Sequence, residues 1–492
     1  MTVSSGAGRR DREKPHPGIE DQEMTNIQAA ITVDQVHQPE MKRVLGALHL
    51  TAIGIGAIIG AGLFSMTGPA AAENAGPAII LSYIIAAIPA GLTGLCYAEL
   101  AAMFPQSGSC YTYVRRTAGD LAGWIIGWDL VLEFAVAAAT VATGFSGYAN
   151  SLMGEFGLHL PSWLLSGPLG NDSGGPPGIV NLPAVLIIVA CSLLLLRGVT
   201  ESAMVNTVIV TVKVIVILLF ILLGLGSVKA GNFIPFVPPS QGGDQFGWPG
   251  VFRAAGTIFF AYIGFETVST AAQESRNPQR DMPIGMIGSL IVCALLYIGF
   301  ATVLVGLVPY AELKGDEAAA QTALAQTPFG WARPAIAVAI LAGFATSILT
   351  ALYGQSRIFA VMAAEGMLPR LFGDIHKTWR TPWKSILLLL LGTGALAGLL
   401  PLDALGDMVS IGTLFAFAAV SGCVLVLRRT RPAQPRPFRV PFGAVLPALG
   451  IICCVGLMFQ LDIYAWGRLL AWLVIGLVVR ALNRQSRLRE AG

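Results

Sequence analysis

Three charged residues stand out deep within long apolar stretches of this 492-residue chain, in which only 12% of the residues are charged. They are Glu133, Lys213 and Glu266, each about 15 to 22 Å into its stretch if that stretch is a helix. Inserting a charge so deeply costs about 2.5 to 3.5 kcal/mol, so such residues by default indicate function. If the three meet at one depth, a proton bound by one changes the field at the others. The group therefore predicts proton chemistry.

Two simpler interpretations of these charges stay open. Glu133 and Lys213 could form an ion pair that only holds the helices together. Glu266 could stabilise a neighbouring half-helix instead of carrying a proton. Asp129 precedes Glu133 by one turn on the same helical face, and on either interpretation it could extend the group.

A glycine-rich stretch at residues 54–64, GIGAIIGAGLF, lies within the first apolar segment. Each glycine costs a helix interior roughly 0.5 to 1 kcal/mol relative to alanine and exposes the backbone. We therefore expect the helix to unwind around Gly60, Ala61 and Gly62. The freed N–H groups, at the start of a half-helix, would bind the carboxylate of a small solute. The alternative is close helix packing, because Gly56 and Gly60 also form a GxxxG pattern.

A second interrupted segment is expected at residues 254–278, the sixth apolar segment of the chain. Three small residues, Gly256, Ala261 and Gly264, lie before, within and after an aromatic cluster. Glu266 follows a few residues later. The cluster consists of Phe259, Phe260 and Tyr262. Interruptions in the first and sixth segments are typical of two inverted five-helix repeats with the substrate between them.

The elements that must position these residues are apolar helices. Twelve stretches of about 20 residues, the length that spans a bilayer, lie between residues 46 and 481. We predict an all-α membrane protein with twelve transmembrane helices. The first repeat covers about 46–226, the second about 251–427, and helices eleven and twelve about 443–481.

The ends of the chain are predicted to be cytoplasmic. Residues 1–40 are polar and charged without apolar periodicity, so we expect a disordered tail, followed by the membrane domain at 41–482. Residues 483–492 would form a second tail. Most of the 31 Lys and Arg residues fall in the loops on one side, which by the positive-inside bias is the cytoplasmic side.

Motifs of enzymes and cofactor sites are missing from the sequence. It contains no HExxH, no CxxC pair and no P-loop, and the run GxGxxxG misses the dinucleotide pattern by one residue. The seven cysteines are interpreted as small core residues, not as a disulfide framework. We expect no enzyme activity, no cofactor, no metal and no nucleic-acid partner, so that any transport runs on gradients.

Six motifs carry a resemblance that runs from about residue 41 to the last apolar segment. They read IGIGAIIGAGLF, YAELAAMFP followed by SGSCYTYV, GWDLVLEF, FFAYIGFETVSTAAQESRNPQRDMP, YGQSRIFAVMAAEGMLP and RPFRVP. Together they resemble the amino acid, polyamine and organocation transporters, in particular the bacterial homologues of cationic amino acid transporters. The resemblance implies the LeuT-like fold of five plus five inverted repeats with discontinuous helices 1 and 6. It also implies uptake of amino acids, driven by protons or running as exchange.

The resemblance implies a backbone site for the substrate in the two interrupted segments. N–H groups of the first segment would bind the α-carboxylate, and carbonyl groups of the second segment would bind the α-amino group. The implied substrate-binding residues are Ile59, Gly60, Ala61, Gly62, Phe259, Ala261, Tyr262 and Gly264. Ala61 stands where some members have Ser or Thr, so one side-chain hydroxyl is missing here.

The resemblance also implies a role for each of the three charged residues. Lys213 matches the family lysine that takes the place of a sodium ion in sodium-coupled relatives, within reach of first-segment carbonyls and Ser347. Glu133 matches a family glutamate, and Glu266 stands where many relatives have Asp. With Lys213, these two residues form the predicted proton-coupling network.

A side-chain pocket is expected at Ser347 and Ala351. Ala351 and Leu352 favour small or apolar side chains, so we expect neutral amino acids such as alanine first and arginine or lysine second. The predicted function is proton-coupled symport in the bacterial inner membrane, with the amino acid, protons and the bilayer as partners. An exchanger on the same fold and a non-transporting amino-acid sensor are the alternatives. The oligomeric state stays open, and a monomer is included.

Overall fold

The computed structural model describes residues 45–104, 110–169, 178–198 and 203–491 of the chain. The tail predicted at residues 1–40 lies outside these described residues. Within them the named elements are all helices, which confirms the all-α prediction. The predicted C-terminal tail at 483–492 continues the last helix, which extends to Ala491.

The long helices follow the apolar segments of the sequence. They are α5 (Ile79–Met103), α6 (Cys110–Glu155), α7 (Leu182–Leu196), α8 (Ala203–Leu225), α11 (Pro278–Leu307), α13 (Arg333–Ala364), α14 (Trp383–Leu399), α15 (Leu402–Thr430), α16 (Val445–Met458) and α17 (Ile463–Ala491). In the described chain, eight helical segments are long and apolar enough to cross a membrane. Four further apolar helices are shorter, at Ala47–Ile58 and at α7, α14 and α16.

The first apolar segment is interrupted near its middle. Helix α2 (Ala47–Ile58) ends at Ile58, and Ile59 and Gly60 have extended backbone angles. Helix α3 (Ala61–Phe64) then begins, and α4 (Thr67–Ala70) follows it. The interruption therefore lies at Ile59 and Gly60, whereas the sequence predicted unwinding through Gly62. Ala61 and Gly62 are already helical.

The sixth apolar segment is interrupted as well. Helix α9 (Gly247–Thr257) tightens into the 3₁₀ turn η5 (Ile258–Tyr262), and α10 (Thr267–Thr270) begins a few residues later. Gly264 lies between them with a φ of 117°, in the left-handed region that other residues rarely adopt. Both interruptions predicted from glycine content are therefore present.

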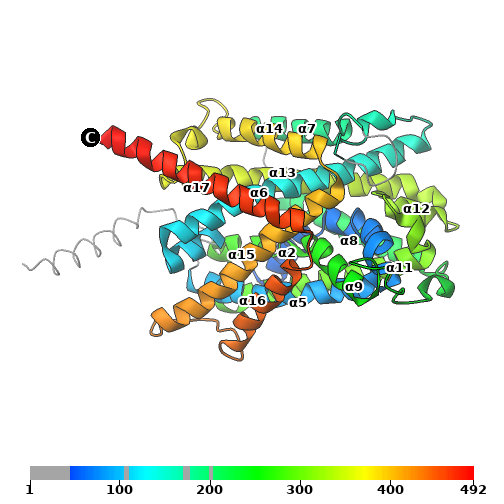
Figure 1. Ribbon diagram of the computed structural model, residues 1–492, viewed down its shortest axis with the longest axis horizontal. Helices are drawn as coiled ribbons and strands as arrows, with labels where there is room; N and C mark the ends of the chain where they lie inside the picture. The colour runs from blue at the N-terminus through cyan, green and yellow to red at the C-terminus, as the bar shows by residue number, and fades with distance from the viewer. Residues whose placement is uncertain (1–44, 105–109, 170–177, 199–202, 492) are drawn as a thin grey trace, which may run out of the picture. The chain divides into compact units, whose positions relative to one another are not determined.

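The interrupted segments are enclosed by long helices. Helix α11 packs against both α2 and α5, and α8 packs against α2 and α13. Helix α6 packs against α13 and α15, and α7 lies beside α14 at the top of the view (Figure 1). As a result, side chains from α8, α11, α13 and α15 can reach the two interruptions.

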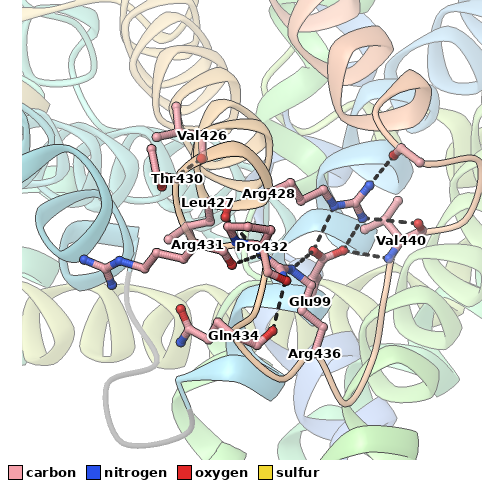
Figure 2. A network of polar contacts seen from close by, with 11 residues as sticks. Glu99, Val426, Leu427, Arg428, Thr430, Arg431, Pro432, Gln434, Arg436 and Val440 are labelled. Carbon is pink, nitrogen blue, oxygen red and sulfur yellow. Dashed lines mark hydrogen bonds and ion pairs between the residues drawn. The ribbon is translucent and has the colours of Figure 1, made fainter.

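A buried acid anchors the segment that follows α15. Glu99, near the end of α5, is 1% exposed and accepts a hydrogen bond from Arg428 Nε at 3.1 Å. Its second oxygen accepts the Val440 N–H at 2.7 Å, and Arg436 Nε lies 3.6 Å from the first (Figure 2). Arg436 also donates to the carbonyls of Leu427 and Arg431. Two arginines and one backbone group therefore depend on a single carboxylate.

Replacing this acid is expected to destabilise the protein strongly. Glu99→Ala leaves two arginines, 11% and 10% exposed, without their partner, and breaking such a buried pair costs about 3 to 5 kcal/mol. The midpoint of thermal unfolding in detergent should fall accordingly. Asp374→Ala is the control, because the Lys384–Asp374 pair is 34% and 45% exposed and should be worth about 1 kcal/mol or less. Equal midpoints for the two variants would contradict this role of Glu99.

Candidate functional site

Lys213 closes the end of α2. Its ammonium Nζ donates to the Ile59 carbonyl at 2.9 Å and to the Gly56 carbonyl at 3.3 Å. It also donates to Ser347 Oγ on α13 at 3.0 Å. The last carbonyl groups of a helix have no partner within the helix and form the negative end of its dipole. A buried cation at this position, 5% exposed, therefore satisfies backbone groups that the interruption would otherwise leave open.

Tyr297 on α11 joins the two interruptions. Its hydroxyl oxygen lies 3.0 Å from the Ile58 carbonyl at the end of α2 and 3.0 Å from the Ala261 carbonyl in η5. A hydroxyl has one proton, so it donates to one of these carbonyls at a time. The other carbonyl then keeps a lone pair for a different donor.

Two further tyrosines pack against Tyr297. The ring centroids of Tyr83 and Tyr262 each lie 5.5 Å from that of Tyr297. Tyr262 donates its hydroxyl to the Tyr83 carbonyl at 3.0 Å, and the Tyr83 hydroxyl lies 3.3 Å from the Gly62 carbonyl. This tyrosine cluster (Tyr83, Tyr262 and Tyr297) is buried and holds both interrupted segments by their backbone.

Close packing explains most glycines of the first segment. A Cβ atom added at three of them would approach a neighbouring residue to 2.5 Å or less. The pairs are Gly54 with Ser289, Gly56 with Val210, and Gly62 with Ala261. At Gly60 an added Cβ would meet only Ser347 Oγ, at 3.8 Å. The packing interpretation therefore holds for Gly54, Gly56 and Gly62, whereas Gly60 faces open space.

The backbone beside Gly60 offers hydrogen-bond donors. No described residue accepts a hydrogen bond from the N–H groups of Gly60, Ala61 or Gly62, and no side chain caps α3. A small cavity, too narrow in this conformation to hold a water molecule, adjoins Gly60. Its lining is apolar except for one cation and consists of Ile59, Gly60, Phe64, Lys213, Val216, Ala339, Ile340, Gly343 and Phe344. Unpartnered N–H groups beside a cavity are suited to bind an anion.

The carbonyls expected to hold an amino group belong to η5 and the turn after it. The approach of Gly62 to Ala261 brings α3 and η5 into contact. Phe259, Ala261 and Tyr262 are buried in η5. The Ala261 carbonyl contacts the Tyr297 hydroxyl, and the Gly264 carbonyl accepts the Thr267 N–H at 3.0 Å. A carbonyl oxygen has two lone pairs, so both can accept a second donor.

The carboxyl groups form a separate group from Lys213. Glu133 on α6 is 5% exposed and interacts electrostatically with Glu266 and Asp129. Among the described residues, no ion pair joins Glu133 to Lys213. Glu266 Oε2 accepts the Gly264 N–H at 2.9 Å and so supports the turn in the sixth segment. Glu133 Oε2 and both Asp129 oxygens are buried without a partner in the described chain.

The two residues expected in a side-chain pocket differ in position. Ser347 contacts Lys213, whereas Ala351, one turn further along α13, is half-buried and does not line the cavity at Gly60. Tyr262 was among the predicted substrate-binding residues, but its partners Tyr83 and Tyr297 were not predicted. The only sequence signal of these two is a hydroxyl-bearing residue within an apolar segment, which aromatic packing explains equally well.

Comparisons with known proteins show the family to which the chain belongs. The family described as amino acid permease matches residues 45–479. The chain is 41% identical to the methylthioribose transporter of Bacillus subtilis, covering 90% of this chain and 94% of the relative. It is 39% identical to the branched-chain amino acid permease BcaP of the same organism, over 92% and 96%. It is 35% identical to the vacuolar cationic amino acid transporter 4 of Arabidopsis thaliana, over 81% and 66%.

The interrupted apolar helices and these matches define a class of protein. The chain is a multi-pass membrane protein of a transporter family, not of an enzyme family. It belongs to the amino acid permease family, within the amino acid, polyamine and organocation superfamily.

Two glycine substitutions should separate packing from ligand binding. Gly62→Ala places a Cβ 2.5 Å from Ala261 Cα, and such overpacking costs about 1 to 3 kcal/mol. Gly60→Ala meets no atom closer than 3.8 Å, so the unliganded protein should keep its midpoint of thermal unfolding. It should nevertheless bind its ligand more weakly, because the methyl group enters the open space. A wild-type midpoint for Gly62→Ala, or wild-type binding by Gly60→Ala, would contradict this division.

Proposed function

We propose that the chain transports amino acids, with the two helix interruptions as the substrate site. The N–H groups of Gly60, Ala61 and Gly62 bind the α-carboxylate, and Ile59 shapes the turn before them. The carbonyls of Phe259, Ala261 and Gly264 bind the α-amino group. The observation that carries this proposal is the contact between the two interruptions at Gly62 and Ala261. Donors without a described partner lie on one side of that contact, and acceptors lie on the other.

The proposed architecture has twelve transmembrane helices in a LeuT-like arrangement of two inverted five-helix repeats. Its support is the position of the interruptions, in the first and sixth apolar segments. The four shorter helices complete the crossings by tilting or by local thinning of the bilayer. Both termini lie in the cytoplasm of a bacterial cell with the protein in its inner membrane, which accords with the distribution of Lys and Arg.

We propose neutral aliphatic amino acids as substrates, from alanine to the branched-chain amino acids. The cavity beside Gly60 is lined by apolar side chains together with Lys213, and no acidic side chain lines it. Because an ammonium group repels a cationic side chain, arginine and lysine rank second. One relative is named a branched-chain amino acid permease, in agreement with this order. Another is named a methylthioribose transporter, and methylthioribose has neither a carboxylate nor an ammonium group.

Transport is proposed to be coupled to protons. Glu133 lies within electrostatic range of two other carboxyl groups of the bundle, those of Asp129 and Glu266. Lys213 holds the end of α2 by hydrogen bonds that require its protons. A change of protonation at Lys213 would loosen the first interruption, and through it the carboxylate site. Exchange of one amino acid for another is the alternative mode on the same fold.

A ligand screen identifies the substrate class. Purified protein is heated with each amino acid in turn and with methylthioribose, since a bound ligand raises the midpoint of unfolding in relation to its occupancy. We expect the largest rise with neutral aliphatic amino acids. D-enantiomers and amino acid amides serve as controls, because the first invert the α-carbon and the second lack the carboxylate that the backbone site is proposed to bind. A rise with methylthioribose alone would contradict the proposal.

Uptake into liposomes tests the role of Lys213. With wild-type protein, an inward proton gradient should raise uptake into empty vesicles, whereas an exchanger would need preloaded vesicles. Lys213→Ala should keep part of the binding but lose the dependence of uptake on pH, because the protonatable link to α2 is gone. Lys229→Ala, at an exposed position in a loop, is the matched control. An unchanged pH profile in Lys213→Ala would refute this role.

A further inference from the structure

Ser410 on α15 inserts its hydroxyl into the interruption of the sixth segment. Its Oγ donates to the Thr257 carbonyl at 3.0 Å and accepts the Phe260 N–H at 3.2 Å. Thr257 is the last residue of α9, and Phe260 lies in η5. Ser410 is fully buried. One side chain from another helix therefore contacts both edges of the point where the α-helix tightens.

Asp407, one turn earlier on α15, holds the same segment from the side of α9. Its Oδ1 accepts the Thr257 hydroxyl at 3.0 Å, and its Oδ2 pairs with Arg253 at 2.5 Å. Arg253 also donates to the Gln460 carbonyl at 3.3 Å. The carboxylate is 5% exposed, so its partners come from protein groups. Helix α15 thus binds the sixth segment at three points, which are Arg253, Thr257 and Phe260.

These contacts give the interruption a physical cause. Sharp changes in a helix occur at proline, at glycine, or where a side chain enters the hydrogen-bond ladder. The stretch from Thr257 to Phe260 contains neither proline nor glycine. A 3₁₀ stretch within a helix often marks a functional hinge. Ser410 is the side chain that enters the backbone hydrogen-bond ladder, between the Thr257 carbonyl and the Phe260 N–H. Asp407 fixes the position of α9 beside it through Thr257 and Arg253.

We propose that Ser410, supported by Asp407, is a positioning residue that orients the Phe259 and Ala261 carbonyls toward the ammonium group of the substrate. The inference rests on the proposed function, since it assigns the amino half of the same site. Phe259 directly precedes the residue that Ser410 binds, and Ala261 directly follows it. Removing the hydroxyl frees this turn to tighten or relax, which moves both carbonyls. The carboxylate half of the site, at Gly60 to Gly62, has no hydrogen bond to Ser410 and touches this turn only where Gly62 packs against Ala261, so it should move less than the two carbonyls.

The test compares ligands with and without the ammonium group. Full-length Ser410→Ala is titrated with L-leucine and L-alanine, and with 4-methylpentanoate and propanoate, the carboxylic acids that lack the amino group of each. We expect the dissociation constant for the amino acids to rise about three- to tenfold, as for the loss of one hydrogen bond. The affinity for these carboxylic acids should change much less, because they have no donor for the two carbonyls and their carboxylate uses the other half of the site. Ser410→Thr, which keeps the hydroxyl, should restore amino acid binding.

Ser421→Ala provides the matched control. Ser421 lies on the same helix and is equally buried, but its hydroxyl faces Thr93 at 3.5 Å, away from the interruption. This variant should bind both ligand classes like the wild type. Wild-type affinity for amino acids in Ser410→Ala, or an equal loss for amino acids and for the carboxylic acids without the amino group, would overturn the inference. If the wild type binds neither amino acid, the proposed function itself fails, and the inference fails with it.

Discussion

Backbone polar groups inside a bilayer have no water to bond, so every interruption of a transmembrane helix needs side chains that close it. In this protein Lys213 and Tyr297 close the end of α2, and Ser410 and Glu266 close the interruption of the sixth segment. Those side chains come from α8, α11 and α15 as well as from the sixth segment itself. The surrounding bundle can therefore be understood as a scaffold that delivers these groups to two short stretches of backbone.

At Gly60 the backbone is not fully hydrogen-bonded within the described chain, and the open groups there can bind a solute. Close packing fills the space around Gly54, Gly56 and Gly62, but Gly60 borders a cavity, and its N–H has no acceptor in the described chain. On the opposite side the Ala261 carbonyl contacts the Tyr297 hydroxyl and, with two lone pairs, can accept a second donor. A solute with a carboxylate and an ammonium group on one carbon complements both sides at once. Recognition by backbone alone leaves the choice among amino acids to the cavity walls.

Much of this arrangement could be predicted from the sequence, because apolar length and glycine content act locally. They predicted the helices and both interruptions, the first of which begins at Ile59 and ends before Ala61. Contacts between distant segments could not be predicted in this way. The depths of Glu133 and Lys213 suggested one cluster, but Lys213 binds the carbonyls at the end of α2, and no ion pair joins it to Glu133 among the described residues. Asp407, a charge within an apolar segment, carried a signal that was overlooked, whereas a tyrosine or serine in such a segment carries almost none.

The most direct measurement is a structure of the protein in lipid with L-leucine or L-alanine bound. We expect the carboxylate oxygens to lie about 2.7 to 3.2 Å from the N–H nitrogens of Gly60, Ala61 or Gly62, the usual hydrogen-bond range. The ammonium group should lie against the carbonyls of Phe259 and Ala261. An amino acid bound away from both interruptions, or with its carboxylate on Lys213, would contradict the central claim.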